Sequence, residues 1–545
     1  MARQRWLLGA TLAAACLQAA CAEEEEVSAT PVESAISVML LGSIGFQMLL
    51  FYLVHWEDTD IKRYAWRVIS QTISIFCAVL IFQGFNGLLE TYLAKGGSEL
   101  WEVMVDMGQL VCWLTGMQIA LAITSGALND LWGGEKPDME KVELNVASWA
   151  VLFSHVAGFS AINAWGSIQQ KLLNGSPTLA ALVVPVGYLS LHIMYQGYDK
   201  IRTLISKSDD GIVDEYEDKW DEETEECEND VAGLSLSFLT VQAIRFAISG
   251  ILPNQEGIES PSTEYSHGGS QWQMLIACGF FFGFLGVSML HVDRFIREPS
   301  ERTERTIKIL NNYFTFGNAW CFFYGVKWAL CSTRFTTETA LLHVVIALSL
   351  SGMAFLLIFV LDKVMDNELL GSDSSSAENA MEKIIVGLGI LVGFSWEQSF
   401  DTAVTVISVS LEKRFPQVVS KLLMSIVLVI IVFPAWRRYI LPIERDLAGD
   451  TSEEGLKKAV LKEAAGQHYS LMICHETDEA ALDLAHLRMK EHRRKAIGHS
   501  HHVRDGLKHL QVSTRGIIEV EKCEEPNEKK KTTHRKTQEV INLLG

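Results

Sequence analysis

The feature that most constrains this chain is a series of eleven apolar stretches that follow one another along the sequence. Each holds roughly 20 mainly apolar residues, the length a helix needs to cross a hydrocarbon layer of about 30 Å. They lie at 35–54, 66–89, 103–125, 146–167, 178–196, 231–252, 273–291, 309–330, 339–361, 384–409 and 417–436. The sequence therefore predicts an all-α fold, a polytopic integral membrane helical bundle of about eleven transmembrane helices in residues 35–436.

The first 22 residues have the pattern of a secretory signal peptide. Arg3 and Arg5 precede a short apolar core, and Ala20-Cys21-Ala22 offers a small-residue cleavage pattern. The alternative is an uncleaved first helix. Cleavage would leave 23–34 as a short segment outside the cytosol, so we expect insertion through the secretory pathway with an extracytosolic N-terminus.

The distribution of basic residues supports this orientation. The loops and flanks predicted to be cytosolic hold sixteen lysine and arginine residues, whereas the opposite loops hold five, and an excess of these residues marks the cytosolic side. The N-x-S/T sequence at Asn174 falls in a predicted outer loop, where it could be glycosylated. Residues 437–545 are then a cytosolic tail, which we expect to be partly helical and partly disordered.

A weak internal repeat of about 80 residues relates the even-numbered stretches. Aligning them makes five positions equivalent, at spacings of 80, 83, 76 and 76 residues: Ile81, Ala161, Ile244, Trp320 and Trp396. Apolar helices align easily by chance, but a nearly constant spacing is harder to obtain that way. The sequence thus predicts five helical hairpin repeats and one closing helix.

Charged residues inside predicted spans mark candidate functional positions, because each costs about 2.5–3.5 kcal/mol on insertion scales. Arg245 lies in the sixth stretch and Glu397 in the tenth, with Asp401 on the same helix face as Glu397. We expect Arg245 to pair with these two acids. A second pair is expected between Lys327 and Asp106.

Uncharged polar residues fall at similar depths and predict a polar belt inside the bundle. They are Gln83, Asn86, Asn163, Ser249 and Gln398. In one interpretation the belt lines a path for a solute or ion, and an acid changes protonation along it. In the other, the charged residues neutralise each other and only lock the helices together.

The polar segments carry weaker signals. The acidic run at 208–230 is expected to be solvated and disordered. Helices are expected in the tail at 456–465 and 478–495. His499, His501 and His502 are weak candidates for a zinc or copper site, since no cysteine lies near them. No cofactor is expected.

The stretch GFSWEQSFD, residues 393–401, resembles uncharacterised multi-pass membrane proteins of unicellular algae. The resemblance covers nine residues and implies no function.

The expected function is that of a transporter or channel for a small solute or ion, because many spans, internal repetition and mid-membrane charges recur in transporters. The alternative is a non-transporting membrane scaffold or receptor-like protein that acts through its tail. A membrane enzyme ranks third, because no catalytic pattern is visible. The expected partner is the lipid bilayer, with no nucleic acid and with an oligomeric state that the sequence leaves open.

Overall fold

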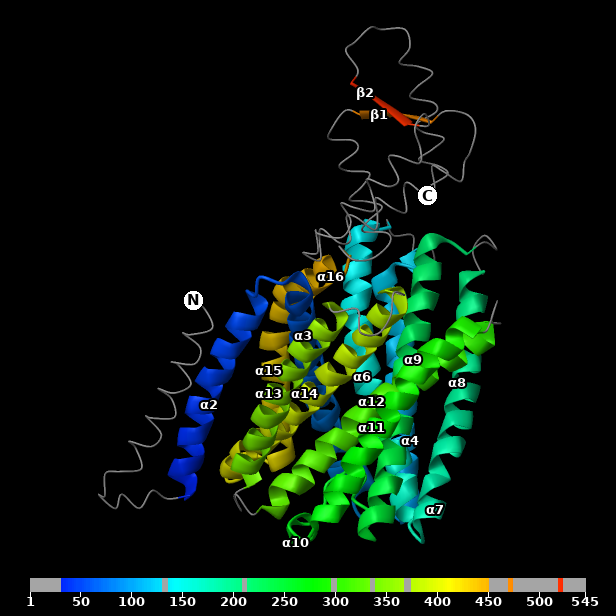
Figure 1. Cartoon of the computed structure of the whole chain (residues 1–545). Helices are drawn as coiled ribbons and strands as arrows, with labels where there is room; N and C mark the ends of the chain where they lie inside the picture. The colour runs from blue at the N-terminus through cyan, green and yellow to red at the C-terminus, as the bar shows by residue number, and fades with distance from the viewer. Residues whose placement is uncertain are drawn as a thin grey trace, which may run out of the picture.

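The chain folds into a bundle of long helices in the computed structural model (Figure 1). The structure describes residues 31–129, 136–207, 213–295, 301–333, 339–366, 374–449, 469–473 and 518–522. The predicted signal peptide at 1–22, the tail helices expected at 456–465 and 478–495, and His499, His501 and His502 lie outside these ranges.

Long helices account for most of the described chain. They are α2 (Pro31–Val54), α3 (Thr59–Leu89), α4 (Glu99–Ser125), α6 (Met139–Lys171), α8 (Val183–Ser206), α9 (Glu215–Ser249), α11 (Gly269–Phe295), α12 (Glu301–Ser332), α13 (Thr339–Asp366), α14 (Ser374–Leu411) and α15 (Gln417–Ala435). Shorter helical pieces are η1 (Glu90–Ala94), α7 (Pro177–Ala181), α10 (Pro261–Glu264), η2 (Trp436–Ile440) and α16 (Leu441–Gly449).

Eight helical segments among the described residues are long and apolar enough to cross a membrane. They are Thr59–Ala94, Glu99–Ser125, Lys141–Lys171, Pro177–Ser206, Glu215–Ser249, Gly269–Met289, Ala340–Lys363 and Gln417–Leu447. The long helices α2, α12 and α14 coincide with the other three predicted stretches, but α2 is shorter in its apolar part and α12 and α14 carry more polar residues. The described chain is therefore helical in its bundle, and eight of its helical segments have the length and apolar composition of membrane spans.

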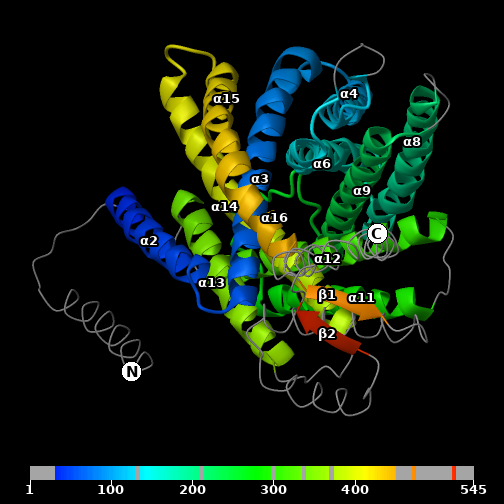
Figure 2. The same ribbon diagram turned by 90° about the horizontal axis from the view of Figure 1, so that it is seen from above.

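Five helices form a closed inner ring. Each packs against the next in the order α3, α6, α9, α12 and α14, and α14 packs back against α3. All five run from the end of the bundle that carries α16 toward the end that carries α10 (Figure 1). The remaining long helices lie around the ring, as the view along the bundle shows (Figure 2).

Glycines let several of these helices approach closely, because a residue without a side chain leaves room for a neighbouring backbone. A Cβ atom at Gly393 of α14 would lie 3.2 Å from the Cα of Thr72 on α3. One at Gly283 of α11 would lie 2.9 Å from the side chain of Asn318 on α12. These glycines serve packing within one chain.

Helix α9 corrects two expectations. It begins at Glu215, sixteen residues before the predicted start at 231, and it ends at Ser249. A capping box between Asp214 and Glu217 starts the helix, because each side chain accepts from the other residue's backbone N–H. Most of the acidic run at 208–230 is thus helical rather than disordered, and Arg245 lies in the last two turns instead of mid-span.

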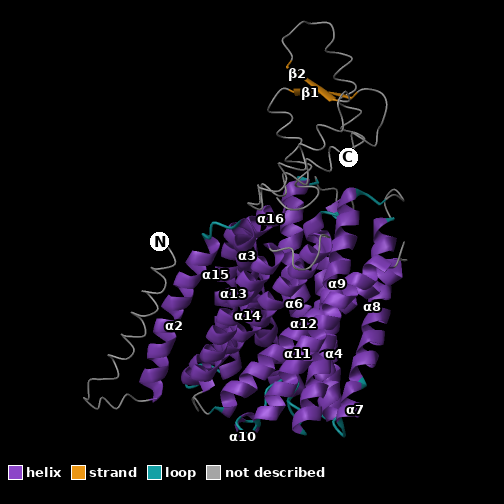
Figure 3. Cartoon of the chain, viewed as in Figure 1, coloured by secondary structure: helices purple, strands orange, loops and turns teal. Residues whose placement is uncertain are grey.

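Helices and loops form the whole bundle, and the strands belong to the tail (Figure 3). Strand β1 (Tyr469–Ile473) pairs antiparallel with β2 (Ile518–Lys522), with Tyr469 opposite Lys522. These strands were not expected from the sequence, which predicted only helices in the tail. The chain also continues as helix beyond α15, through η2 into α16, so the polar tail begins with helical structure.

Candidate functional site

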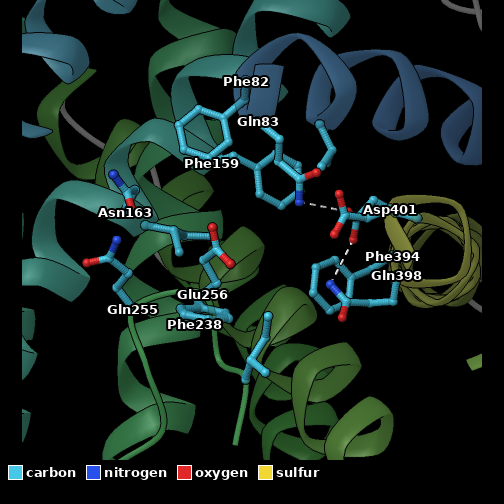
Figure 4. A pocket seen from close by; sticks show the side chains of 14 residues that line it. Phe82, Gln83, Phe159, Asn163, Phe238, Gln255, Glu256, Phe394, Gln398 and Asp401 are labelled. Atoms are coloured by element: carbon cyan, nitrogen blue, oxygen red, sulfur yellow. Dashed lines mark hydrogen bonds between the residues drawn. The ribbon is translucent and has the colours of Figure 1, made fainter. Parts of the chain in front are cut away.

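A small cavity lies inside the inner ring, on the side of the bundle where α10 lies (Figure 4). The free space is about 40 Å³, enough for a few waters or an ion, since one water needs at least ~10–15 Å³. The lining side chains come from four ring helices and from the segment after α9. They are Val79, Phe82, Gln83, Phe159, Ile162, Asn163, Phe238, Gln255, Glu256, Ile258, Phe394, Glu397, Gln398 and Asp401.

Glu397 on α14 is the most deeply buried acid of this wall, with 3% of its surface exposed. Its Oε1 accepts a hydrogen bond from Nε2 of Gln83 at 3.2 Å, and its Oε2 accepts one from Nε2 of Gln398 at 3.0 Å. Both donors are uncharged. Within the described ranges, no basic side chain forms an ion pair with Glu397.

Asp401 lies one turn further along α14 and does have a basic partner. Its Oδ1 lies 2.6 Å from Nζ of Lys421 on α15. Lys421 falls inside the stretch predicted at 417–436 but is not among the predicted site residues. Its position in an otherwise apolar helix was the signal that could have identified it.

Glu256 supplies the third carboxylate and comes from the segment between α9 and α10. Its side chain is half-buried and turned toward the space across which Gln398 and Asp401 lie (Figure 4). Burial raises the pKa of Glu256 to about 7, and the nearby charges of Glu90 and Asp401 add to the shift while Lys421 opposes it. Glu256 lies in a polar segment between helices, where an acid does not stand out in the sequence as it does within an apolar span.

Two amide oxygens of cavity-lining residues accept no hydrogen bond from any residue that the structure describes. Asn163 on α6 is 1% exposed, and its Nδ2 donates to Asp106 at 3.1 Å and to Asn86 at 3.2 Å, which leaves its Oδ1 unpartnered. Nε2 of Gln83 donates to Glu397, and its Oε1 is likewise unpartnered. A carboxylate only accepts hydrogen bonds, so these contacts fix which end of each amide is free.

Hydrogen bonds extend the polar region from the cavity toward the α10 end. Ser167 Oγ contacts both Asp106 and Oε1 of Gln255, the latter at 2.8 Å. Nε2 of Gln255 donates to Glu90 at 3.3 Å, and Glu90 also accepts from Asn86 at 2.9 Å. Glu90 is exposed. Gln83, Asn163 and Gln398 therefore line one cavity, Asn86 contacts Asn163, and the hydrogen bonds reach an exposed acid, whereas Ser249 donates to the carbonyl of Arg245 at the end of α9.

The predicted pairing of Arg245 with Glu397 and Asp401 is wrong. Arg245 Nη2 lies 2.5 Å from Oε1 of Glu259, and its Nη1 donates to the carbonyl of Gly257 at 3.0 Å. The guanidinium also covers the ring of Tyr324, with 3.6 Å between its Cζ and the ring centroid. The physical reason is that the segment after α9 folds back into the bundle and brings its own acid to the base.

Glu259 is bound on both sides. Its Oε2 accepts from Nε2 of His267 at 2.6 Å and from Nε1 of Trp328 at 3.2 Å. Burial alone raises the pKa of this carboxyl, but the His267 hydrogen bond and the Arg245 charge outweigh burial and hold the pKa at about 2.

The predicted pairing of Lys327 with Asp106 is also wrong, for the same reason. Lys327 Nζ lies 2.5 Å from Oε1 of Glu264, the last residue of α10. Asp106 instead accepts from Asn163 and Ser167. Thus two of the three acids in residues 250–268 that face inward, Glu259 and Glu264, neutralise buried bases, and Glu256 faces the cavity.

Aromatic rings from ring helices close the cavity on the side toward α16. Phe159 and Phe394 lie about one turn before Asn163 and Glu397 on their helices, and their ring centroids are 6.4 Å apart. Trp320 of α12 lies 4.5 Å from Phe394 and 5.1 Å from Phe238 of α9, again between centroids. We call Phe159, Phe238, Trp320 and Phe394 the aromatic layer.

A second buried charge cluster lies nearer the α16 end and was not predicted. Glu228 of α9 has no exposed surface. Its Oε1 accepts from Arg202 at 3.0 Å and from Gln118 at 2.7 Å, and its Oε2 accepts from Arg305 at 2.5 Å. The cluster ties α4, α8 and α12 to α9, so its evident role is to hold helices together.

Two other groups have simpler explanations. Asn174 is exposed in the turn between α6 and α7, as the expected glycosylation requires. The carboxylates of Asp58, Asp60 and Asp362 lie within 4.8 Å of one another. Asp58 caps α3 and Asp60 lies 3.3 Å from Arg63, so these acids have structural partners.

Comparison with protein-family models, with curated proteins and with solved structures finds no match to this chain.

Proposed function

We propose that this protein is a transporter or channel that moves a small solute or ion through its inner ring. The single observation that carries the proposal is the acid-lined cavity on the inside of the ring, connected by hydrogen-bonded polar side chains to the exposed Glu90. Polar and ionisable side chains inside a membrane bundle are costly and commonly mark solute or ion pathways.

The cavity also weighs against the alternative of a non-transporting scaffold. A bundle that served only to display its tail would gain stability from neutralised charges and a filled interior. Here Glu397 is buried among uncharged partners, and the amide oxygens of Asn163 and Gln83 have no donor within the described part of the chain. Buried groups left in this state are typical of sites that await another molecule.

The proposal includes all eleven stretches as spans and places the N-terminus outside the cytosol. In that arrangement the ring consists of the second, fourth, sixth, eighth and tenth spans, the same ones that the 80-residue repeat relates. A ring of five parallel helices is what five repeats of a hairpin would give, which supports the repeat without establishing it. The α10 end would then be extracytosolic and the α16 end cytosolic.

Flux measurements in proteoliposomes test the proposal. Purified protein is reconstituted and screened for uptake of inorganic cations, inorganic anions, protons, amino acids and sugars. We expect flux of at least one of them, reduced in Glu397→Gln and unchanged in Glu412→Gln, which alters an exposed acid just beyond α14. Flux equal to that of empty liposomes for every solute, or flux unchanged by Glu397→Gln, would refute the function.

A further inference from the structure

The charges around the cavity do not balance. Three carboxylates line it, from Glu256, Glu397 and Asp401, and one base lies beside it, Lys421, which is bound to Asp401. Among the described residues, neither Glu256 nor Glu397 forms an ion pair with a basic side chain, so two negative charges face the same space when both are ionised. A buried charge normally requires a partner of opposite charge.

An acidic cluster alone does not define a site, but the amide oxygens provide an independent indication. Asn163 lines the cavity and is almost completely buried, and no donor among the described residues reaches its Oδ1. The Oε1 of Gln83 is in the same state. A buried carbonyl oxygen without a donor loses the full value of its hydrogen bond with water. Both oxygens, like the two acids, would be satisfied by a positively charged ligand.

The available ligand atoms identify the class of cation. All polar side chains lining the cavity are carboxylates or carboxamides, and none is cysteine or histidine. An all-oxygen set of this kind suits hard cations, whereas zinc and copper favour nitrogen and sulfur. Ca²⁺ accepts carboxylate, amide and water oxygens in flexible geometry, whereas Mg²⁺ demands a strict octahedron and gives up its waters reluctantly.

We propose that this cavity binds a hard divalent cation of the size of Ca²⁺, with Glu256 and Glu397 as charged ligands and the amide oxygens of Asn163 and Gln83 as neutral ones. Two carboxylates balance the double charge, and water fills the remaining positions in the cavity. That the protein also transports this cation rests on the proposed function. Binding of the cation can be measured without measuring transport.

Equilibrium binding of radioactive calcium to the purified full-length protein tests the site. We expect saturable binding to the wild type that Mg²⁺ and Na⁺ displace poorly. Glu397→Gln and Glu256→Gln should each weaken it by at least about tenfold, since loss of supporting groups alone commonly costs 10–100-fold in metal affinity. Glu412→Gln should bind as the wild type does.

A measurement on the wild type alone tests the site even if the variants do not fold. Ca²⁺ should raise its thermal midpoint in a concentration-dependent manner, as any ligand of the folded state does, and Na⁺ should not. Absence of both saturable binding and a thermal shift would overturn the site. So would calcium binding that survives in both acid variants, or binding of Na⁺ alone.

The outcomes separate this inference from the proposed function. Calcium binding that requires Glu397, without flux of any solute, would keep the site and refute transport. Flux of another solute that requires Glu397, without calcium binding, would keep transport and refute the site.

Discussion

Arg245 and Glu259 bind each other at 2.5 Å in a region where neither side chain has appreciable contact with solvent. Arg245 lies within α9, and Glu259 lies in the segment that follows α9. The pair therefore fixes residues 250–268 against the bundle. Glu256, which faces the cavity, is part of the segment held in this way. The pair therefore acts on the cavity through the position of its loop.

Breaking this pair from one side should destabilise the protein. Arg245→Met or Glu259→Gln alone leaves a buried group without its partner, which costs about 3–5 kcal/mol when a buried ion pair is broken, whereas replacing both partners can be nearly neutral. We expect each single variant to lower the midpoint of thermal unfolding in detergent. Size-exclusion chromatography of heated samples measures this midpoint. The double variant should recover much of the loss.

The control combines Arg245→Met with Glu397→Gln. Arg245 pairs with Glu259 and not with Glu397 among the described residues, so this double variant should not recover the loss caused by Arg245→Met, and the effects of the two changes should add, as they do for distant sites. Recovery in this combination, and none with Glu259→Gln, would contradict the pairing.

The same pair predicts a dependence of stability on pH. The pKa of Glu259 in the folded state is about 2, below the value of 4.5 for a free glutamate. Its ionised form therefore stabilises the fold fully above about pH 4.5, and this contribution is lost as the pH falls toward 2. Arg245 and His267 are the charged or titratable groups that face it, and Tyr324 stacks on Arg245.

The thermal midpoints of wild type and Glu259→Gln, measured as a function of pH, check this. The difference between the two should be largest above pH 4.5 and should shrink as the pH is lowered. A difference that grows on acidification would show that the carboxyl is not ionised in the fold.

The sequence predicted the class of fold because apolar stretches of about 20 residues have few alternatives to spanning a membrane. It also identified Gln83, Asn163 and Glu397, because polar residues stand out within apolar helices. It failed at Arg245 and Lys327, whose partners lie in residues 250–268. Nothing in the local pattern of a polar segment shows that it folds back between helices, so Glu256, Glu259 and Glu264 were not considered.

The prediction that the acidic run at 208–230 is disordered was wrong for a related reason. Charge density predicts solvation when the charges face water, but Glu228 faces Arg202 and Arg305 from other helices. Such complementarity depends on tertiary contacts. The function class, the eleven spans and the repeat remain predictions.

The Glu228 cluster gives a third prediction, concerned with stability. Glu228→Gln removes the charge between two arginines in a fully buried position, and breaking a buried ion network of this kind costs about 3–5 kcal/mol. We expect a clear fall in thermal midpoint and folded yield. Glu226→Gln changes an exposed acid of the same helix and should have little effect. Equal behaviour of the two variants would contradict the structural role of Glu228.

The fourth prediction concerns topology. The turn that holds Asn174 lies at the end of the bundle opposite α16 (Figure 1). With the excess of lysine and arginine toward the cytosol, we expect Asn174 outside and α16 inside. A C-terminal tag should resist protease on intact cells, and Asn174→Gln should abolish any glycosidase-sensitive shift. A tag cleaved without permeabilisation would reverse the orientation.

The fifth prediction concerns the aromatic layer and depends on the proposed function. Phe394 contacts both Phe159 and Trp320, so Phe394→Ala removes the ring that joins two sides of the layer. Apolar constrictions can close a path by excluding water, and widening one lets water and ions pass. We therefore expect Phe394→Ala to raise basal flux in proteoliposomes above the wild-type level.

Two comparisons make this test specific. Phe284→Ala alters a phenylalanine that is 68% exposed on α11 and should leave flux unchanged, although both variants lose the same side-chain volume. Phe394→Ala also leaves a cavity, which lowers the free energy of unfolding by about 3–5 kcal/mol. The fraction of folded protein is therefore measured for each preparation before flux is compared. If correctly folded Phe394→Ala protein conducts no more than the wild type, the aromatic layer does not restrict the path, and its rings serve packing alone.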